Sequence, residues 1–199
     1  LYLMATHAIA ADTENKYFKL TADIRLNDVS DSNWKDSPAL WFSAGSFRGH
    51  LDGDGHVVYG LYNTKSEDSN YFGLFTATMS NDTTKVVIKN LGIENSYIEG
   101  RFAGAFVGNA NGSNYARLTM ENCYAGKDVV VKGSERCGGL ISSISKSDVS
   151  INNCYFIGTL TTTATIYKGG LAGYLGCGKA GAQTISISNS YAVTTGNDA

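Results

Sequence analysis

The chain has 199 residues, of which 43% are hydrophobic and 17% are charged, and its formal net charge is −2. A chain of this size and composition can bury a real core, and the absence of a long basic run argues against binding to nucleic acid or to an anionic membrane surface. No stretch approaches the roughly 20 apolar residues of a membrane span, so membrane insertion is not expected.

The first 16 residues predict a cap. Leu1 to Ala11 is apolar and helix-permissive, without Gly or Pro, and Asp12 to Asn15 is a polar turn. The segment Ala8-Ile9-Ala10 imitates a signal-peptide cleavage site, but the basic residues that should precede it are missing. We therefore expect a short N-terminal capping helix within residues 1–16, with a secretion remnant as the alternative.

Residues 17–70 predict a first coil that contains an irregular loop. Its apolar residues alternate with the period of a strand, at Leu20, Ala22, Ile24 and Leu26. From Asn27 to Ser46 the chain is polar and carries its one proline. We expect a surface loop here that folds Trp34 or Trp41 back onto the body.

A glycine-rich stretch follows in which possible metal ligands occupy alternate positions, at His50, Asp52, Asp54 and His56. A straight strand would place all four side chains on one face, as a divalent metal requires. The glycines between them are instead typical of a sharp turn, because Gly adopts positive φ without cost. We favour a turn that reverses the coil and predict no metal or cofactor, with a metal site as the alternative.

Residues 71–199 repeat two short phrases. The first is glycine-rich and steps by 31, 35 and 31 residues between Gly73, Gly104, Gly139 and Gly170. The second contains an asparagine and steps by 32, 31 and 36 residues between Asn90, Asn122, Asn153 and Asn189. Periods of this length are typical of solenoids, and the β-branched, alternating apolar runs favour strands over helices.

Repeats with the same sequence pattern stack most simply as parallel coils, with neighbouring strands about 4.8 Å apart. The sequence therefore predicts an all-β protein, a right-handed parallel β-helix of about four or five coils that forms a single domain over residues 1–199. The handedness follows the usual rule for parallel crossovers. The predicted core is Leu20, Ile24, Leu61, Leu74, Phe75, Ile88, Phe106, Met120, Leu140, Ile151, Tyr155, Leu171, Ile187 and Tyr191.

Uninterrupted alternation through the asparagine phrase places five residues on one face: Val149, Ile151, Asn153, Tyr155 and Ile157. The asparagines would then point inward and hydrogen-bond from coil to coil in a structural ladder, with a polar ligand-binding row as the alternative. The tyrosines two residues later, Tyr124, Tyr155 and Tyr191, share that parity and are expected in the core. Their alternative is a flat platform for sugar rings.

The four cysteines divide into a repeat-matched pair, Cys123 and Cys154, and the unmatched Cys137 and Cys177. Stacked coils would bring the pair within disulfide range, but parallel neighbours do not easily reach a dihedral angle near 90°. Free thiols are favoured, with a bridge as the alternative. All three histidines lie in the N-terminal third, which argues against a cysteine nucleophile.

One stretch resembles a known family. Phe47 to His56 reads Phe-x-Gly-x-Leu-Asp-Gly-x-Gly-His, follows a Tyr-x-Leu-Thr-x-Asp-Ile strand and precedes a Gly-Leu pair. It resembles the N-terminal coil of bacterial surface β-helix proteins with the Glug motif, and the later Gly-Gly-Leu and Asn-x-Tyr phrases resemble the Glug repeats. The resemblance runs from about Tyr17 to Val193. The chain departs from it at Ala105, where Leu is usual, and in the turn of residues 144–147, which lacks the usual Gly.

Proteins of this kind include adhesins, cell-wall-anchored proteins and the non-catalytic part of secreted immunoglobulin A peptidases. The resemblance thus implies an extracellular or cell-surface location and, as partners, host or microbial surface glycans or proteins. We also expect a monomer and, because the solenoid has no obvious C-terminal cap, a fragment of a longer protein.

No reaction is indicated by the residues themselves. The carboxylates of the repeats occupy no matched positions and form no obvious pair: Glu94, Glu99, Glu121, Asp128, Glu135 and Asp148. Phosphate-loop, zinc-peptidase and serine-hydrolase motifs are absent from the sequence. We therefore predict a non-catalytic structural or adhesive segment of a secreted or cell-surface bacterial protein. The alternative is a substrate- or glycan-recognition module of a larger secreted peptidase or carbohydrate-active enzyme.

Overall fold

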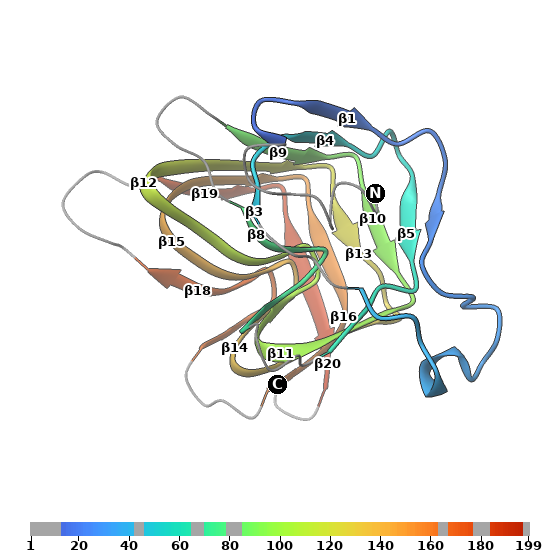
Figure 1. Ribbon diagram of the computed structural model, residues 1–199. Helices are drawn as coiled ribbons and strands as arrows, with labels where there is room; N and C mark the ends of the chain where they lie inside the picture. Colours follow the sequence, from blue (N-terminus) through green and yellow to red (C-terminus); the bar gives the residue numbers. More distant parts are fainter. Residues whose placement is uncertain are drawn as a thin grey trace.

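The computed structural model describes residues 13–41, 46–64, 70–78, 85–162, 167–176 and 184–196, with only the backbone of residues 111–116. These residues form an all-β parallel β-solenoid of about four turns, which confirms the prediction of an all-β protein with parallel stacked coils. Strands from successive coils lie side by side in parallel (Figure 1). Among the described residues, no helix is long and apolar enough to cross a lipid bilayer.

Two sheets form the walls of the solenoid. The nine-stranded sheet consists of β1 (Tyr17–Lys19), β3 (Ser46–Phe47), β4 (His50–Asp52), β8 (Phe75–Thr78), β9 (Val86–Lys89), β12 (Val107–Glu121), β15 (Ile141–Asn152), β18 (Ala172–Gly176) and β19 (Ile185–Ser188). The eleven-stranded sheet consists of β2 (Ile24–Arg25), β5 (Val57–Tyr59), β6 (Tyr62–Asn63), β7 (Tyr71–Phe72), β10 (Gly92–Glu94), β11 (Ser96–Gly104), β13 (Tyr124–Ala125), β14 (Val129–Gly138), β16 (Tyr155–Thr162), β17 (Tyr167–Gly169) and β20 (Tyr191–Thr195).

The two phrases of the sequence are the two corners at which the chain passes between these sheets. The asparagine phrase leads from the nine-stranded to the eleven-stranded sheet, as from β9 to β10, β12 to β13 and β15 to β16. The glycine phrase leads back again, as from β11 to β12 and β14 to β15. One copy of each phrase per coil is therefore a geometric requirement of the fold.

The core fills the space between the sheets with rows of apolar residues in register. One such row on the nine-stranded sheet is fully buried and runs through Leu51, Ile88, Met120 and Ile151. Burying each large aliphatic side chain contributes about 1.5–3 kcal/mol, so the hydrophobic effect holds consecutive coils together. Nine of the predicted core residues are buried: Leu20, Leu61, Leu74, Phe75, Ile88, Phe106, Met120, Leu140 and Ile151.

The remaining predictions for the core need correction. Ile24 and Leu171 are partly buried and pack against the core. Ile187 is in register with Ile151 but is 43% exposed, because the described strands place no further coil beyond β19. Tyr155 and Tyr191 were wrongly assigned to the interior, since Tyr155 is half-buried and Tyr191 is 51% exposed on the outer surface.

The repeat glycines lie at the glycine corner, but their predicted alignment is shifted by one residue in two coils. The strand register pairs Gly104 with Gly138 and Gly138 with Gly169, whereas the repeat spacing predicts that Gly104 aligns with Gly139 and Gly170. The Gly-Gly doublets make the choice ambiguous in the sequence. Gly73 immediately follows Phe72, the partner of Ala103, and so occupies the position equivalent to Gly104.

The irregular loop after β2 behaves as predicted. Trp41 is buried, and its Nε1 donates a hydrogen bond to the carbonyl oxygen of Leu74 (2.9 Å). Trp34 begins the short 3₁₀ helix η1 (Trp34–Asp36) and packs edge-on against Tyr62. The capping helix predicted within residues 1–16 falls mainly on residues 1–12, which lie outside the described part of the chain. Glu14 and Asn15 form a turn shortly before β1.

Candidate functional site

The asparagine corner has a left-handed backbone in each repeat. Asn90, Asn122, Asn153 and Asn189 have φ between 50° and 54°. Asn tolerates this conformation better than other residues with a side chain, and the conformation turns the strand sharply. The turn reverses the alternation of the side chains: Ile151 is buried, Asn153 is exposed, and Cys154 and Phe156 are buried. The side chains of the corner therefore face outward, and the predicted inward orientation is wrong.

The corner asparagines are hydrogen-bonded along the outer surface. Asn153 Nδ2 donates to Asn122 Oδ1 (2.7 Å), and Asn122 Nδ2 donates to Asn90 Oδ1 (2.8 Å). At the last coil Asn189 Nδ2 donates to Asn152 Oδ1 instead (3.0 Å). Asn90 and Asn122 each use one donor and one acceptor, and the row links the coils without a buried polar group.

Replacing Asn122 by Ala should destabilise the chain by about 2 kcal/mol. The change removes two hydrogen bonds of about 1 kcal/mol each at most and forces Ala into a left-handed backbone. Asn122→Gly is the matched control, because Gly keeps the backbone but loses the hydrogen bonds, so its loss should be about half as large. Urea unfolding measures both. A Gly variant as unstable as the Ala variant would contradict a role for the backbone.

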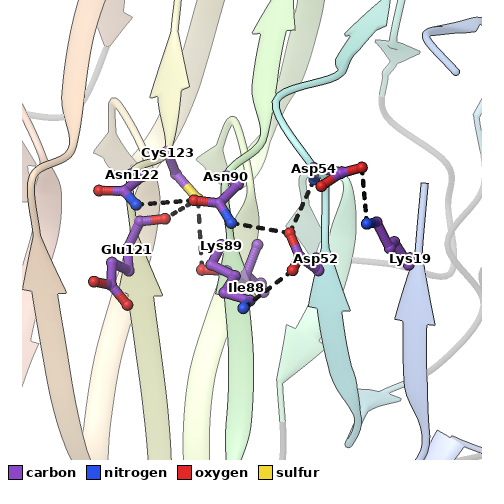
Figure 2. Close-up of polar contacts among 9 residues, drawn as sticks. All are labelled: Lys19, Asp52, Asp54, Ile88, Lys89, Asn90, Glu121, Asn122 and Cys123. Atoms are coloured by element: carbon purple, nitrogen blue, oxygen red, sulfur yellow. Dashed lines mark hydrogen bonds and ion pairs between the residues drawn. The ribbon is translucent and has the colours of Figure 1, made fainter. Parts of the chain in front are cut away.

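The asparagine row ends at Asp52, as Figure 2 shows. Asp52 Oδ1 accepts hydrogen bonds from Asn90 Nδ2 (3.0 Å) and from the Asp54 backbone N–H (2.9 Å), and Oδ2 pairs with Lys89 Nζ (3.0 Å). Burial disfavours ionisation of Asp52, but these three partners outweigh it and lower its pKa to about 2. Asp52 is therefore ionised at neutral pH and joins the turn, the asparagine row and a lysine.

The pKa of Asp52 predicts an acid-sensitive contribution to stability. Because the folded pKa lies below the unfolded value, the contribution is fully present above pH 4 and is lost as the pH falls toward 2. Asp52→Asn keeps an acceptor for Asn90 but removes the charge. It should cost about 1 kcal/mol at pH 7 and flatten the fall in stability between pH 4 and 2. Thermal unfolding across this range tests it, and parallel pH profiles for the two proteins would contradict it.

The alternating His and Asp side chains of the turn contact different partners and do not point toward a common site. Asp54 and Gly55 have positive φ, as the turn interpretation requires. Asp54 pairs with Lys19 (2.9 Å), and His56 Nδ1 lies 3.1 Å from Asp23 Oδ1. His50 stacks on Tyr17 with ring centroids 4.3 Å apart. No group of three or more His, Cys, Asp or Glu side chains placed to hold a metal occurs among the residues that the structure describes.

A row of alternating charges crosses the outer face of the nine-stranded sheet, one position before the asparagine corner. The register places in line Lys19, Asp52, Lys89 and Glu121. Opposite charges on neighbouring strands attract, and a slip in pairing would separate them. The row therefore favours the observed pairing of the first coils.

This charged row forms one side of a groove of about 460 Å³, here named the Tyr17 groove. It is lined by residues of β1, β4, β9 and β12 and by Lys85. A parallel outer row forms the other side, through Tyr17, His50, Val87 and Thr119. The volume lies within the range of small-ligand sites, and the walls combine aromatic, aliphatic and charged groups.

The tyrosines of the asparagine phrase form a second outer feature, a stack across three coils. Tyr124 and Tyr155 have ring centroids 5.0 Å apart, and Tyr155 and Tyr191 have centroids 5.3 Å apart, with nearly parallel planes. Tyr124 Oη also donates to Glu94 Oε1 (2.8 Å). Because each ring covers the face of the next, the stack shows mainly ring edges and hydroxyl groups to solvent. This geometry favours cross-coil stabilisation over a flat platform for sugar rings.

The cysteines within the described residues are free and buried: Cys123, Cys137 and Cys154. Cys123 Sγ lies 3.5 Å from the carbonyl oxygen of Ile88 and 3.3 Å from that of Glu121, and these two oxygens share its single S–H donor (Figure 2). Burial raises the pKa of Cys137 to about 12, so its thiol is protonated at neutral pH. Cys177 lies outside the described residues.

Three of the repeat carboxylates are engaged in separate interactions. Glu94 accepts from Tyr124, Glu99 pairs with Lys132 (2.9 Å), and Glu135 pairs with Arg101 (2.6 Å). The Tyr17 groove is not apparent from the repeat phrases themselves. The available sequence signal for this groove is the residue that precedes each asparagine corner. Positive and negative charges alternate at this position from one coil to the next over the first coils.

No family model matches the chain, so its membership of the Glug-motif proteins stays a prediction. A "Putative Gly-rich membrane protein" of Evansella cellulosilytica is 31% identical over 102 residues, which are 51% of this chain and 11% of that protein. "Halomucin" of Haloquadratum walsbyi is 29% identical over 147 residues, which are 70% of this chain and 2% of that protein. The chain thus corresponds to a small part of each of these relatives.

A similar solved structure is that of a "putative immunoglobulin A1 protease" from Bacteroides ovatus. It has a TM-score of 0.49 and 17% sequence identity, and the match covers 93% of this chain and 72% of that chain.

Proposed function

We propose that the chain is a non-catalytic structural and adhesive segment of a secreted or cell-surface bacterial protein, built as a right-handed parallel β-helix. The observation that carries this proposal is that outward-facing side chains connect neighbouring coils. The asparagine row, the tyrosine stack and the charged row all connect one coil to the next. Groups that hold neighbouring coils in register make a stiff rod that can carry a binding surface.

Two further findings support the proposal. The chain resembles small portions of longer proteins, one of which is described as a membrane protein, and a stacked rod suits such a portion. Its net charge of −2 gives no electrostatic basis for nucleic-acid binding. The partners that fit best are glycans or proteins of host or microbial surfaces, bound by a monomeric rod.

Adhesion of beads coated with the purified chain to host and bacterial cells tests this function. The expected result is saturable adhesion that soluble chain competes away, while peptides and polysaccharides mixed with the chain keep their mass. Hydrolysis that scales with the concentration of the chain and copurifies with it would contradict the proposal, as would a lack of competition by the soluble chain.

A further inference from the structure

The last described coil has an unpaired side, here named the last-coil edge, which is formed by β18, β19 and β20. Each of these strands pairs with the coil before it: β18 and β19 with β15, and β20 with β16. No described strand pairs with their other side. A strand that is paired on one side leaves alternate backbone N–H and C=O groups without strand partners, so this edge can accept a further strand.

The last-coil edge also exposes side chains that continue the covered rows of the earlier coils. Ile187 continues the inward row of Ile151, which is fully buried, yet Ile187 is 43% exposed. Leu175 of β18 is 49% exposed. Tyr191 stacks on Tyr155 with one face of its ring and is 51% exposed. The edge therefore presents the same apolar row and the same tyrosine stack that join neighbouring coils within the chain.

The asparagine row gives the last-coil edge a direction. In each link the amide nitrogen donates to the preceding coil, as Asn153 Nδ2 donates to Asn122 Oδ1 and Asn189 Nδ2 donates to Asn152 Oδ1. Within the described part of the chain, Asn189 Oδ1 accepts no hydrogen bond. A partner that continues the row must bring an amide donor to Asn189 on a left-handed corner. Another asparagine phrase meets both requirements.

A second copy of the chain fits this edge less well. In a head-to-tail stack the first coil would meet the edge, and its Leu20 stands where the later coils have asparagine, directly after the row of Lys19, Asp52 and Lys89. This arrangement would cover Asn189 Oδ1 without a donor, which is unfavourable. Two last-coil edges brought together would run antiparallel, whereas the coils of this solenoid pair in parallel.

We propose that the last-coil edge is a strand-acceptor site for a polypeptide that carries one further asparagine phrase, apolar-x-apolar-x-Asn-x-Tyr-x-apolar. The bound segment adds in parallel to β19, turns at its asparagine and continues along β20. Its second apolar residue covers Ile187, its asparagine donates to Asn189 Oδ1, and its tyrosine stacks on the free face of Tyr191. This inference goes beyond the proposed adhesive function and does not depend on it.

A fluorescent synthetic peptide that copies residues 147–159 tests the proposal. It carries Cys154→Ser, because the last coil itself has Ser190 at this position. Fluorescence anisotropy with the full chain should show saturable binding to one site, and hydrogen exchange should slow at the amides of β19 and β20 but not at those of β1. Asn153→Ala in the peptide should weaken binding about tenfold, because it removes the donor and strains the corner. A scrambled peptide should not bind.

Two matched variants of the chain locate the site. Ile187→Asp places a carboxylate in the apolar contact and should abolish measurable binding of the peptide. Ser186→Asp lies one residue earlier in β19, on the outer side with Ser150, and should change the affinity by no more than about twofold. Both positions are exposed, so both variants should fold, as circular dichroism verifies. Asn189→Gly keeps the left-handed corner without the acceptor and should weaken binding about fivefold.

Three results would overturn the assignment: no binding of the copied peptide, equal binding of the scrambled peptide, or unchanged binding to Ile187→Asp. A concentration-dependent dimer that Ile187→Asp dissociates, together with no binding of the peptide, would make a second copy the occupant and would also contradict the proposal. The peptide measurements involve no cells, so their failure leaves the adhesion test of the proposed function unaffected.

Discussion

Ile151→Asp is expected to unfold or aggregate the chain. Ile151 is fully buried between Met120 and Ile187 of the neighbouring coils, and Asp there would place a carboxylate in the core without a partner. Such a group costs more than about 4 kcal/mol, which is comparable with the 5–15 kcal/mol that stabilises most domains. Circular dichroism and size-exclusion chromatography should show loss of the folded monomer.

Ser150→Asp is the matched control for that change. Ser150 is the preceding residue of β15, lies on the outer face, and has Thr119 and Ser186 as register neighbours. A carboxylate there remains hydrated, so the free energy of unfolding should change by no more than about 0.5 kcal/mol. Equal sensitivity of the two positions would contradict the inward and outward assignment of β15.

Gly139→Ala is expected to destabilise the chain by about 3 kcal/mol. A Cβ at Gly139 would lie 2.1 Å from the carbonyl oxygen of Gly170 and 2.4 Å from Cγ of Phe156. The first of these atoms belongs to the backbone of the next coil, so relief of the clash requires two coils to separate. For a domain of this size, a loss of 3 kcal/mol lowers the Tm by about 6–12 °C.

Gly126→Ala provides the comparison for Gly139→Ala. The nearest atom to a Cβ at Gly126 is Cγ of Glu94, at 3.2 Å, and this flexible side chain can move. The Tm of this variant should stay within about 2 °C of the parent value. If calorimetry gave equal losses for both glycines, close approach of the coils at the glycine corner would be excluded as the cause.

The architecture was predictable because repetition and alternation are properties of the sequence itself. The alternation Val149, Ile151 identifies the inward residues of β15, and the repeat length indicates coils. Which side chains after the corner point into the core could not be predicted by continuing the alternation of the strand. Asn153 adopts φ 52°, and this turn exchanges the inward and outward positions. A period of two holds only within a strand. Asn repeated at one position was itself the available signal for a left-handed corner.

The candidate site was less predictable than the fold. The turn at Asp54 and Gly55 followed from the local glycines. The Tyr17 groove did not, because Tyr17 and Glu121 are far apart in the sequence and line the same groove only through the register of four strands. A register error of one residue would turn every side chain of a strand to the other face, so the groove can be recognised only after the pairing is known.

The central claim is that each asparagine corner reverses the inside and the outside of the chain. Thermal unfolding of Tyr155→Lys and Phe156→Lys tests it most directly. Phe156 is fully buried, whereas Tyr155 lies in the outer stack between Tyr124 and Tyr191. We predict that Tyr155→Lys folds with a loss of about 1–2 kcal/mol from the stack and that Phe156→Lys does not fold. A folded Phe156→Lys together with an unfolded Tyr155→Lys would show that the alternation continues through the corner and would contradict the claim.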